Sequence, residues 1–272
     1  AQQETYLPAF TDEKKPAVAS LAIAEAGPLA DARKPATKGE LRGDKLVLTG
    51  EKALVPCADS ADLFVVTAEV DGDLRLVIVE AGTEGFTKGN KLDKVGQVES
   101  DTSELFFDNV RLPADALLGP QDLGFIAMMK HLPQERIGNA IANIANAKQI
   151  LAETIQYCKD RKAFGQPIGS FQHNTFKIAE MVTKIEVSEA YIDDCVAAHA
   201  EGKLTAVDAA KAKWWAAQVQ CDVLDECVQL HGGYGYMNEY RVARAWRDAR
   251  VHKIWAGSNE IMKMIIGRDL GL

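Results

Sequence analysis

The pattern of apolar residues changes once along this chain of 272 residues, near Leu112-Pro113, and no other feature constrains the fold as strongly. Before that point, short segments rich in Val, Leu and Phe alternate with turn signals such as Asp71-Gly72-Asp73. These segments are residues 45–49, 63–68, 74–79 and 105–112. Their even spacing predicts a small antiparallel, barrel-like β-domain over residues 21–113, after a lead-in segment of residues 1–20. No glycine-rich phosphate loop follows a strand, which argues against a Rossmann site.

Residues 114–272 have the pattern of long helices. Apolar residues recur at helical spacing over residues 124–160, 170–202, 205–230 and 259–267. Long helices joined by short loops pack antiparallel, so we expect an up-and-down four-helix bundle over this region. The fold class predicted for the whole chain is α+β.

Composition excludes several classes of function. The net charge of −8 argues against binding to nucleic acid or to an anionic membrane, because both favour a basic surface. No apolar run is long enough to span a bilayer, and no signal peptide is recognisable. The five cysteines lack the spacing of zinc ligands, so no metal site is expected, and their odd number suits a reducing compartment. We expect a protein of the cytoplasm, or of the mitochondrial matrix if its source is eukaryotic.

Three irregular stretches in the helical region could bind a ligand. Arg161 and Phe164 lie together at a turn, which suits a phosphate beside a planar ring, although a basic residue also complements the dipole at a helix end. The glycines of residues 232–235 permit close approach of a ligand or simply cap a helix, and His231 beside them is either a base or a packed residue. Ser258 fits an N-cap, at a helix start that could serve an anion or a carbonyl oxygen.

Four runs follow one another along the chain: Leu132-Pro133-Gln134-Glu135-Arg136, Arg161-Lys162-Ala163-Phe164-Gly165, Gln229-Leu230-His231-Gly232-Gly233-Tyr234-Gly235-Tyr236 and Gly257-Ser258-Asn259-Glu260-Ile261. In residues and spacing they resemble the acyl-CoA dehydrogenase family, over essentially all of the chain. The resemblance implies the family's middle β-domain and C-terminal four-helix bundle, with its N-terminal helical domain absent from this chain. The function implied is the FAD-dependent oxidation of an acyl-CoA thioester to the trans-2-enoyl-CoA, as in fatty-acid β-oxidation. Electron-transferring flavoprotein is the implied electron acceptor, and the implied assembly is a homo- or hetero-oligomer, a dimer of dimers.

The resemblance assigns the catalytic base to Glu135. Most family members carry a glutamate in the loop before the last helix, where this chain has Ala256. A minority, which includes the long-chain and isovaleryl-CoA types, carry it on the first bundle helix at the position of Glu135. Residues near one helical turn away, such as Leu132 and Gly138, are apolar or small, so we expect a partly desolvated carboxylate, as suits a general base. The alternative is a solvated helix glutamate paired with a basic residue.

By the same resemblance, Arg136 contacts the CoA portion, and Ala256 and Gly257 lie at the thioester, whose carbonyl the Ala256 N–H would polarise. Arg161 and Phe164 resemble the pair that reaches the FAD of a neighbouring subunit. The other implied FAD contacts are Gln172, Gln229, Gly232, Gly233, Ser258 and Glu260.

The β-domain departs from the family pattern near the flavin. Ala30 replaces a serine near the pyrophosphate, and Leu54-Val55-Pro56 replaces the usual Trp-Ile-Thr beside the flavin ring. Pro56 offers neither a hydroxyl nor an N–H. Two alternatives to an active dehydrogenase therefore stay open: a silent subunit that completes the FAD site of another subunit, and an acyl-CoA-binding or oxidase-like relative.

Overall fold

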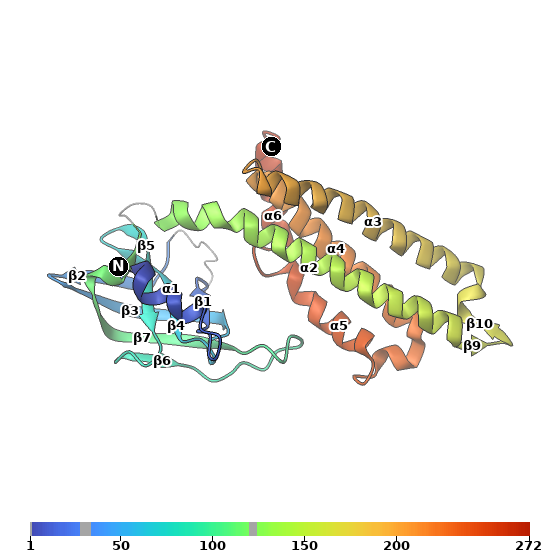
Figure 1. Ribbon diagram of the computed structural model, residues 1–272, viewed down its shortest axis with the longest axis horizontal. Helices are drawn as coiled ribbons and strands as arrows, with labels where there is room; N and C mark the ends of the chain where they lie inside the picture. Colours follow the sequence, from blue (N-terminus) through green and yellow to red (C-terminus); the bar gives the residue numbers. More distant parts are fainter. Residues whose placement is uncertain (1, 28–33, 120–123) are drawn as a thin grey trace. The chain divides into compact units, whose positions relative to one another are not determined.

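The structure, a computed structural model, describes residues 2–27, 34–119 and 124–272 (Figure 1). It divides into two compact units. The β-unit comprises Ala1–Lys94 and Val98–Met128, and the helical unit comprises Val95–Gln97 and Met129–Leu272.

The β-unit is built on one mixed sheet. Its elements are α1 (Gln2–Phe10), β1 (Ala19–Ala22), β2 (Lys38–Arg42), β3 (Lys45–Pro56), β4 (Leu63–Val70), β5 (Asp73–Glu80), β6 (Phe86–Lys88), β7 (Thr102–Pro113), η1 (Ala114–Ala116) and β8 (Leu117–Leu118). The strand order is β6-β7-β3-β2-β4-β5-β8, and β1 pairs with β4 off this path. Phe86 packs in the core of this unit, stacked on Phe107 at 5.2 Å between ring centroids and edge-on to Phe64 at 5.1 Å.

The four segments expected as strands are confirmed as parts of β3, β4, β5 and β7. Asp71 and Gly72 both have positive φ (53° and 89°), as a two-residue hairpin turn between β4 and β5 requires. Most strand pairs of the sheet are antiparallel, as expected, but the sheet is mixed, because β1 and β2 pair with β4 in parallel. Neither strand is joined to β4 by a hairpin, and longer connections permit parallel pairing.

The β-unit also extends past Pro113, the limit expected from the change of pattern. Leu117 and Leu118 of β8 pair with Val77 and Leu76 of β5, and Ala116 is buried in the core of the sheet. Short pairings of this kind depend on the partner strand more than on the local sequence, which explains why they were not expected.

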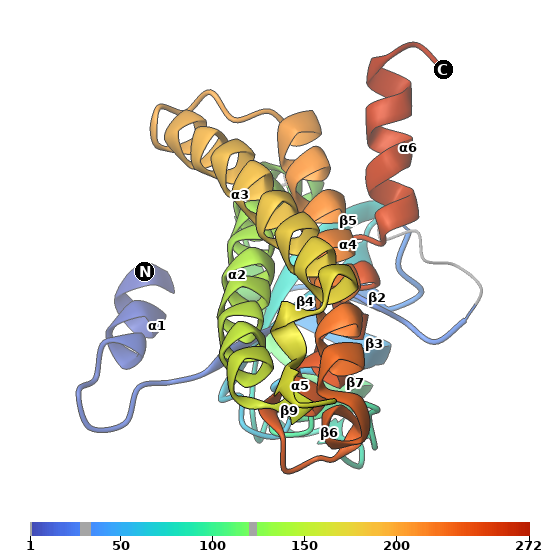
Figure 2. The same ribbon diagram turned by 90° about the vertical axis from the view of Figure 1, so that its right-hand side faces the viewer.

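The helical unit contains the expected bundle and one further helix. Its elements are α2 (Gly124–Asp160), β9 (Lys162–Ala163), β10 (Gln166–Pro167), η2 (Ile168–Ser170), α3 (Gln172–Ala200), α4 (Ala206–His231), η3 (Gly232–Tyr236), α5 (Arg241–Ala249), η4 (Arg250–Lys253) and α6 (Asn259–Asp269). Helices α2, α3 and α4 run side by side (Figures 1 and 2). Helix α4 contacts α3, α5 and α6, and its buried alanines, among them Ala209, Ala212 and Ala216, allow close approach. None of the helices in the described ranges is long and apolar enough to cross a membrane.

Candidate active site

A two-residue hairpin follows the C-terminus of α2 and carries Arg161 and Phe164. Phe164 and Gly165 have φ of +52° and +82°, so they form the turn that joins the paired strands β9 and β10. The Phe164 side chain is 97% exposed at the tip of this turn. Such a phenyl ring contributes little to the fold of this chain and is available to a ligand or to another subunit.

Arg161 lies in a surface pocket of about 450 Å³, together with three other residues expected to bind FAD: Gln229, Gly232 and Gly233. Its guanidinium carbon lies 5.7 Å from the ring centroid of Tyr234. Gly232 has a φ of +60°, and no atom lies within 4 Å of the place where a Cβ would stand, either there or at Gly233. The backbone is therefore open to close approach by a ligand.

The sequence left two possible roles for His231, a base or a packed residue, and the structure supports the packed residue. His231 is buried, its Nδ1 lies 2.8 Å from the carbonyl oxygen of Cys227, and its ring stacks on Tyr157 at 4.2 Å between centroids. Gln172 begins α3 as an exposed residue; it and Phe164 do not line the pocket that holds Arg161.

Glu135 lies on α2 with an exposed side chain, whereas the next residues, Arg136 and Ile137, are buried. The expected partial desolvation of this carboxylate is therefore not supplied by the helical unit, because α2 turns its Arg136 and Ile137 side toward the bundle core. No atom lies within 4 Å of a Cβ built on Gly138, one helical turn further, so there is open space beside Glu135.

The loop before α6 forms a tight turn at the residues expected to meet the thioester. Ala256 and Gly257 both have positive φ, +54° and +89°. Ser258 caps α6, because its Oγ accepts a hydrogen bond from the Ile261 N–H at 3.3 Å. Glu260, in the first turn of α6, is exposed. A Cβ on Gly257 would stand 2.6 Å from Cε of Met262 and 3.8 Å from a guanidinium nitrogen of Arg136, so the structure brings Arg136 and this turn together.

A group of basic residues surrounds the turn, and sequence reasoning missed two of them. Lys213 on α4 is fully buried and donates a hydrogen bond from Nζ to the Gly257 carbonyl at 2.6 Å. His252 lies between Asn139, at 3.4 Å from its Nδ1, and Trp255, whose Nε1 donates to that nitrogen at 3.1 Å. The sequence signal that could have identified Lys213 is its position in an alanine-rich stretch of α4 that faces the core.

Burial lowers the pKa of each of these basic groups. It lowers the pKa of Arg136, and it lowers that of Lys213 to about 8, helped by the positive charge of Arg136. The pKa of His252 falls to about 4, through burial and the charge of Lys213, so this imidazole is neutral at neutral pH. The Nε of Arg136 is buried without a hydrogen-bond partner among the described residues.

The positions at which the sequence departs from the family lie in the β-unit. Leu54 stands at a register irregularity of β3, with a φ of +54° and a side chain 67% exposed. A leucine in this conformation is strained, and such strain concentrates at functional positions. Pro56 ends β3. Ala30, with the rest of residues 28–33, lies outside the described residues.

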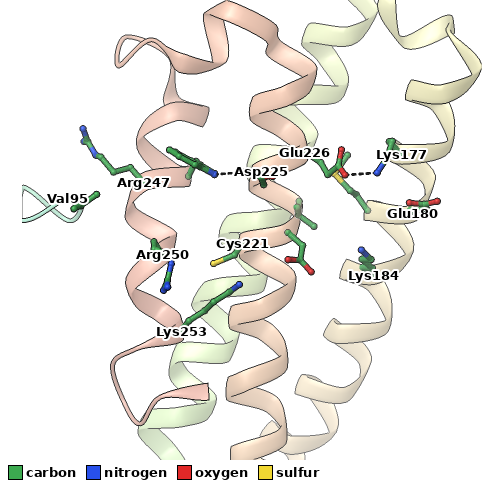
Figure 3. A pocket seen from close by; sticks show the side chains of 14 residues that line it. Val95, Lys177, Glu180, Lys184, Cys221, Asp225, Glu226, Arg247, Arg250 and Lys253 are labelled. Carbon is green, nitrogen blue, oxygen red and sulfur yellow. Dashed lines mark hydrogen bonds and ion pairs between the residues drawn. The ribbon is translucent and has the colours of Figure 1, made fainter. Parts of the chain in front are cut away.

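A second pocket, of about 570 Å³, lies between α3, α4 and the α5–η4 segment of the helical unit (Figure 3). Acidic and basic side chains alternate around it. Lys177 and Glu226 form an ion pair at 2.6 Å, and Nε1 of Trp246 donates to Asp225 at 3.0 Å. None of the residues expected to bind substrate or cofactor lines it, so it is not part of the candidate active site.

Comparison with known proteins decides the family. Residues 20–110 match the acyl-CoA dehydrogenase middle domain, and residues 122–271 match the acyl-CoA dehydrogenase C-terminal domain. The chain belongs to the acyl-CoA dehydrogenase family. It is 41% identical over 276 residues to the mitochondrial long-chain specific acyl-CoA dehydrogenase of Mus musculus, an alignment that covers 99% of this chain and 64% of the relative. The chain thus spans less than two thirds of the length of that relative.

Solved structures of the family have the same fold. The crystal structure of acyl-CoA dehydrogenase from Geobacillus kaustophilus matches with a TM-score of 0.95 and 38% identity, over 100% of this chain and 73% of that one. An acyl-CoA dehydrogenase from Bacillus anthracis, solved in complex with FAD, matches with a TM-score of 0.87 and 29% identity, over 93% of this chain and 47% of that one. The family and the β-domain plus helical-domain fold expected from the sequence are confirmed.

Proposed function

We propose that this chain carries the acid–base and cofactor-binding residues of an FAD-dependent acyl-CoA dehydrogenase, which oxidises an acyl-CoA thioester to the trans-2-enoyl-CoA. The observation that supports this most directly is the pairing of two features in the helical unit. A glutamate next to open space on α2 is followed by Arg136, and Arg136 lies beside the strained Ala256-Gly257 turn.

Glu135 acts as the general base in this proposal. Its carboxylate takes the proton from the carbon α to the thioester, and the N–H of Ala256 polarises the thioester carbonyl on which negative charge develops. That role of Ala256 needs only the backbone, so the lack of a carboxylate at this position does not abolish it. In this proposal Arg136 contacts the CoA portion of the substrate, and Gly257 lies at the thioester.

The residues around Arg161 fit the pyrophosphate and adenine end of FAD. The guanidinium offers charge-assisted hydrogen bonds, Tyr234 and Phe164 offer planar rings, and the open glycine backbone at residues 232 and 233 allows close contact. Gln172, Gln229, Ser258 and Glu260 complete the cofactor contacts that we propose. When bound, FAD accepts the hydrogen that leaves the β-carbon as hydride, and electron-transferring flavoprotein then collects the electrons.

We also propose an assembly and a cellular location for the protein. Because Arg161 and Phe164 would serve a neighbouring subunit's FAD, the working form is an oligomer, a dimer of dimers. We place it in the cytoplasm, or in the mitochondrial matrix if the source is eukaryotic.

The test is Glu135→Gln, with Glu153→Gln on the same helix as the matched control. An amide of nearly the same shape cannot accept the α-proton, so we expect bleaching of the flavin by acyl-CoA to slow by roughly 10²- to 10⁴-fold, with flavin content unchanged. The control should bleach at the rate of the unaltered protein. Undiminished bleaching in the Glu135 variant would refute its assignment as the base.

A second candidate function is a silent subunit that completes another subunit's FAD site. The replacements at Leu54 and Pro56 favour it, because they remove side chains that the family places beside the flavin. The visible spectrum of the purified protein separates the two. A flavin band that bleaches on addition of acyl-CoA supports the dehydrogenase, and a flavin-free protein that restores flavin to a related subunit supports the partner.

A further inference from the structure

Lys213 is a buried ammonium group that donates a hydrogen bond to a backbone carbonyl. It lies on α4 among buried alanines, and its Nζ donates to the Gly257 carbonyl, 44 residues further along the chain, at 2.6 Å. Burying a charged amine costs much free energy unless it is well compensated, and a single neutral carbonyl is modest compensation. The fold therefore maintains this contact at a cost to its own stability.

The surroundings of Lys213 make its charge unusual. The positive charge of Arg136 on α2 disfavours the protonated form of Lys213, and the charge of Lys213 in turn helps to keep His252 on η4 neutral. The acidic group that favours its charge is Glu260 on α6, which is exposed. No ion pair joins Lys213 or Arg136 to a carboxylate among the described residues. The positive charge of the cluster is therefore only partly offset, by Glu135 for Arg136 and by Glu260 for Lys213, both of which are exposed.

The turn that Lys213 holds is strained. Ala256 has a φ of +54°, a conformation that is unfavourable for a non-glycine residue and persists only where its surroundings enforce it. Three contacts enforce it here. Lys213 binds the Gly257 carbonyl, Ser258 caps the helix that follows, and Met262 packs against Gly257.

We propose that Lys213 is a positioning residue of the dehydrogenation, which holds the Ala256-Gly257 turn so that the Ala256 N–H points at the thioester carbonyl. This inference rests on the proposed function. The ammonium group does not need to touch the substrate, because it acts through the Gly257 carbonyl. Its charge, with that of Arg136, also stabilises negative charge that develops on the thioester oxygen nearby.

The contact should depend on pH. Because the pKa of Lys213 lies at about 8, the lysine loses its proton above this pH and the hydrogen bond to Gly257 is no longer charge-assisted. The amide signals of Ala256 and Gly257 should therefore titrate near pH 8. His252 cannot cause this change, since its pKa is about 4.

The experiment compares Lys213→Met, which keeps the length of the side chain and removes its charge, with Lys213→Arg, which keeps the charge. Lys211→Met, at an exposed position on the same helix, is the control. In the FAD-loaded protein we expect Lys213→Met to lower kcat by roughly 10- to 100-fold, in line with the loss of a group that stabilises transition-state charge. The KM for acyl-CoA and the flavin content should stay close to their original values, Lys213→Arg should recover part of kcat, and the control should change neither.

Nuclear magnetic resonance of the Ala256 and Gly257 amides gives a readout that does not depend on turnover. The titration near pH 8 should be present in the unaltered protein and absent from Lys213→Met. An unchanged kcat in Lys213→Met, or a loss that only follows the loss of flavin, overturns the proposal. If Lys213→Met does not fold, absence of the amide titration in the unaltered protein overturns it. A protein whose flavin is not reduced by any acyl-CoA disproves the proposed function instead, while the amide titration still tests the contact.

Discussion

Replacement of Lys52 by methionine should destabilise the β-unit strongly. Lys52 on β3 is fully buried, and its Nζ donates to a carboxylate oxygen of Glu25 at 2.6 Å and to Oγ1 of Thr67 at 3.0 Å. The same Glu25 accepts hydrogen bonds from the backbone of Ala36 and from the backbone and hydroxyl of Thr37. One ion pair therefore fixes both ends of the stretch between Glu25 and Thr37, the region that the family resemblance associates with FAD.

The magnitude follows from the difference between the pKa of Glu25 in the folded protein and its usual value. Burial acts to raise the pKa of Glu25, but the hydrogen bonds from Lys52 and Thr37 outweigh it and hold the pKa at about 2 instead of the usual 4.5. This difference corresponds to about 3 kcal/mol of stability, present above pH 4.5 and lost as the pH falls toward 2. Burial lowers the pKa of Lys52, so the lysine bears a desolvation cost that offsets part of the gain. Removal of the lysine alone leaves a buried carboxylate without its cation, which typically costs about 3–5 kcal/mol.

Hydrogen exchange of the amides in β1, β3 and β4 at pH 7 measures this loss. We expect exchange roughly 100- to 4,000-fold faster in Lys52→Met, since about 1.4 kcal/mol corresponds to a tenfold change and the expected cost is about 3–5 kcal/mol. Lys38→Met removes an exposed pair with Glu69 in the same unit and should cost less than about 1 kcal/mol. The double variant Glu25→Gln with Lys52→Met should exchange more slowly than Lys52→Met alone. Protection in Lys52→Met within about threefold of the original would refute the reasoning.

Two further changes test the candidate site. Arg161→Ala should weaken FAD binding by roughly 10- to 100-fold in equilibrium dialysis, because a charge-assisted contact contributes about 1.5–3 kcal/mol. Lys159→Ala, at an exposed position, is the control. Full flavin occupancy in the arginine variant would count against the cofactor assignment. Gly257→Ala should lower the melting temperature and slow flavin bleaching, because the new Cβ would stand 2.6 Å from Cε of Met262 at a φ of +89°. Gly267→Ala is the matched control, because nothing lies within 4 Å of a Cβ at that position. Equal effects at both glycines would contradict the argument.

The parts of the fold that could be predicted from sequence are those set by local patterns. Residues 63–68 and 74–79 were predicted as strands because β-branched and apolar residues run between clear turn signals, and they lie within β4 and β5. Helices α3, α4 and α6 show helical periodicity in the sequence. The parallel pairing of β1 and β2 with β4 was not visible, since it is decided by residues far apart in the chain. Helix α5 was missed because nine residues rich in arginine give too short an apolar pattern.

The same distinction applies to the site. Glu135, Arg161 and the glycines at 232 and 233 could be proposed as site residues from the sequence because they stand in recognisable runs. The role of Lys213 depends on a hydrogen bond to a residue 44 positions away, and an isolated lysine in a helix is normally taken as solvated. Likewise, an alanine gives no sequence signal of a positive φ, so the φ of +54° at Ala256 could not be predicted.

If Glu135 on α2 is the base, as we propose, the turn before α6 is left with the role of stabilising charge on the thioester. A carboxylate at position 256, where most family members carry one, would stand in the loop beside Arg136 and Lys213 and would offset their charge. With alanine there, no ion pair joins Arg136 to a carboxylate among the described residues, and its Nε is buried without a hydrogen bond. Among these residues, the one acidic group that favours the charge of Arg136 is its exposed neighbour Glu135. In the proposed mechanism, the positive charge of the cluster acts on the thioester oxygen, while Glu135 on a different helix removes the proton. The proposed base and the groups proposed to stabilise negative charge thus lie on separate elements. Glu135→Gln should therefore slow the reaction by removing the proton acceptor, and Lys213→Met by weakening the stabilisation of the charge that proton removal creates.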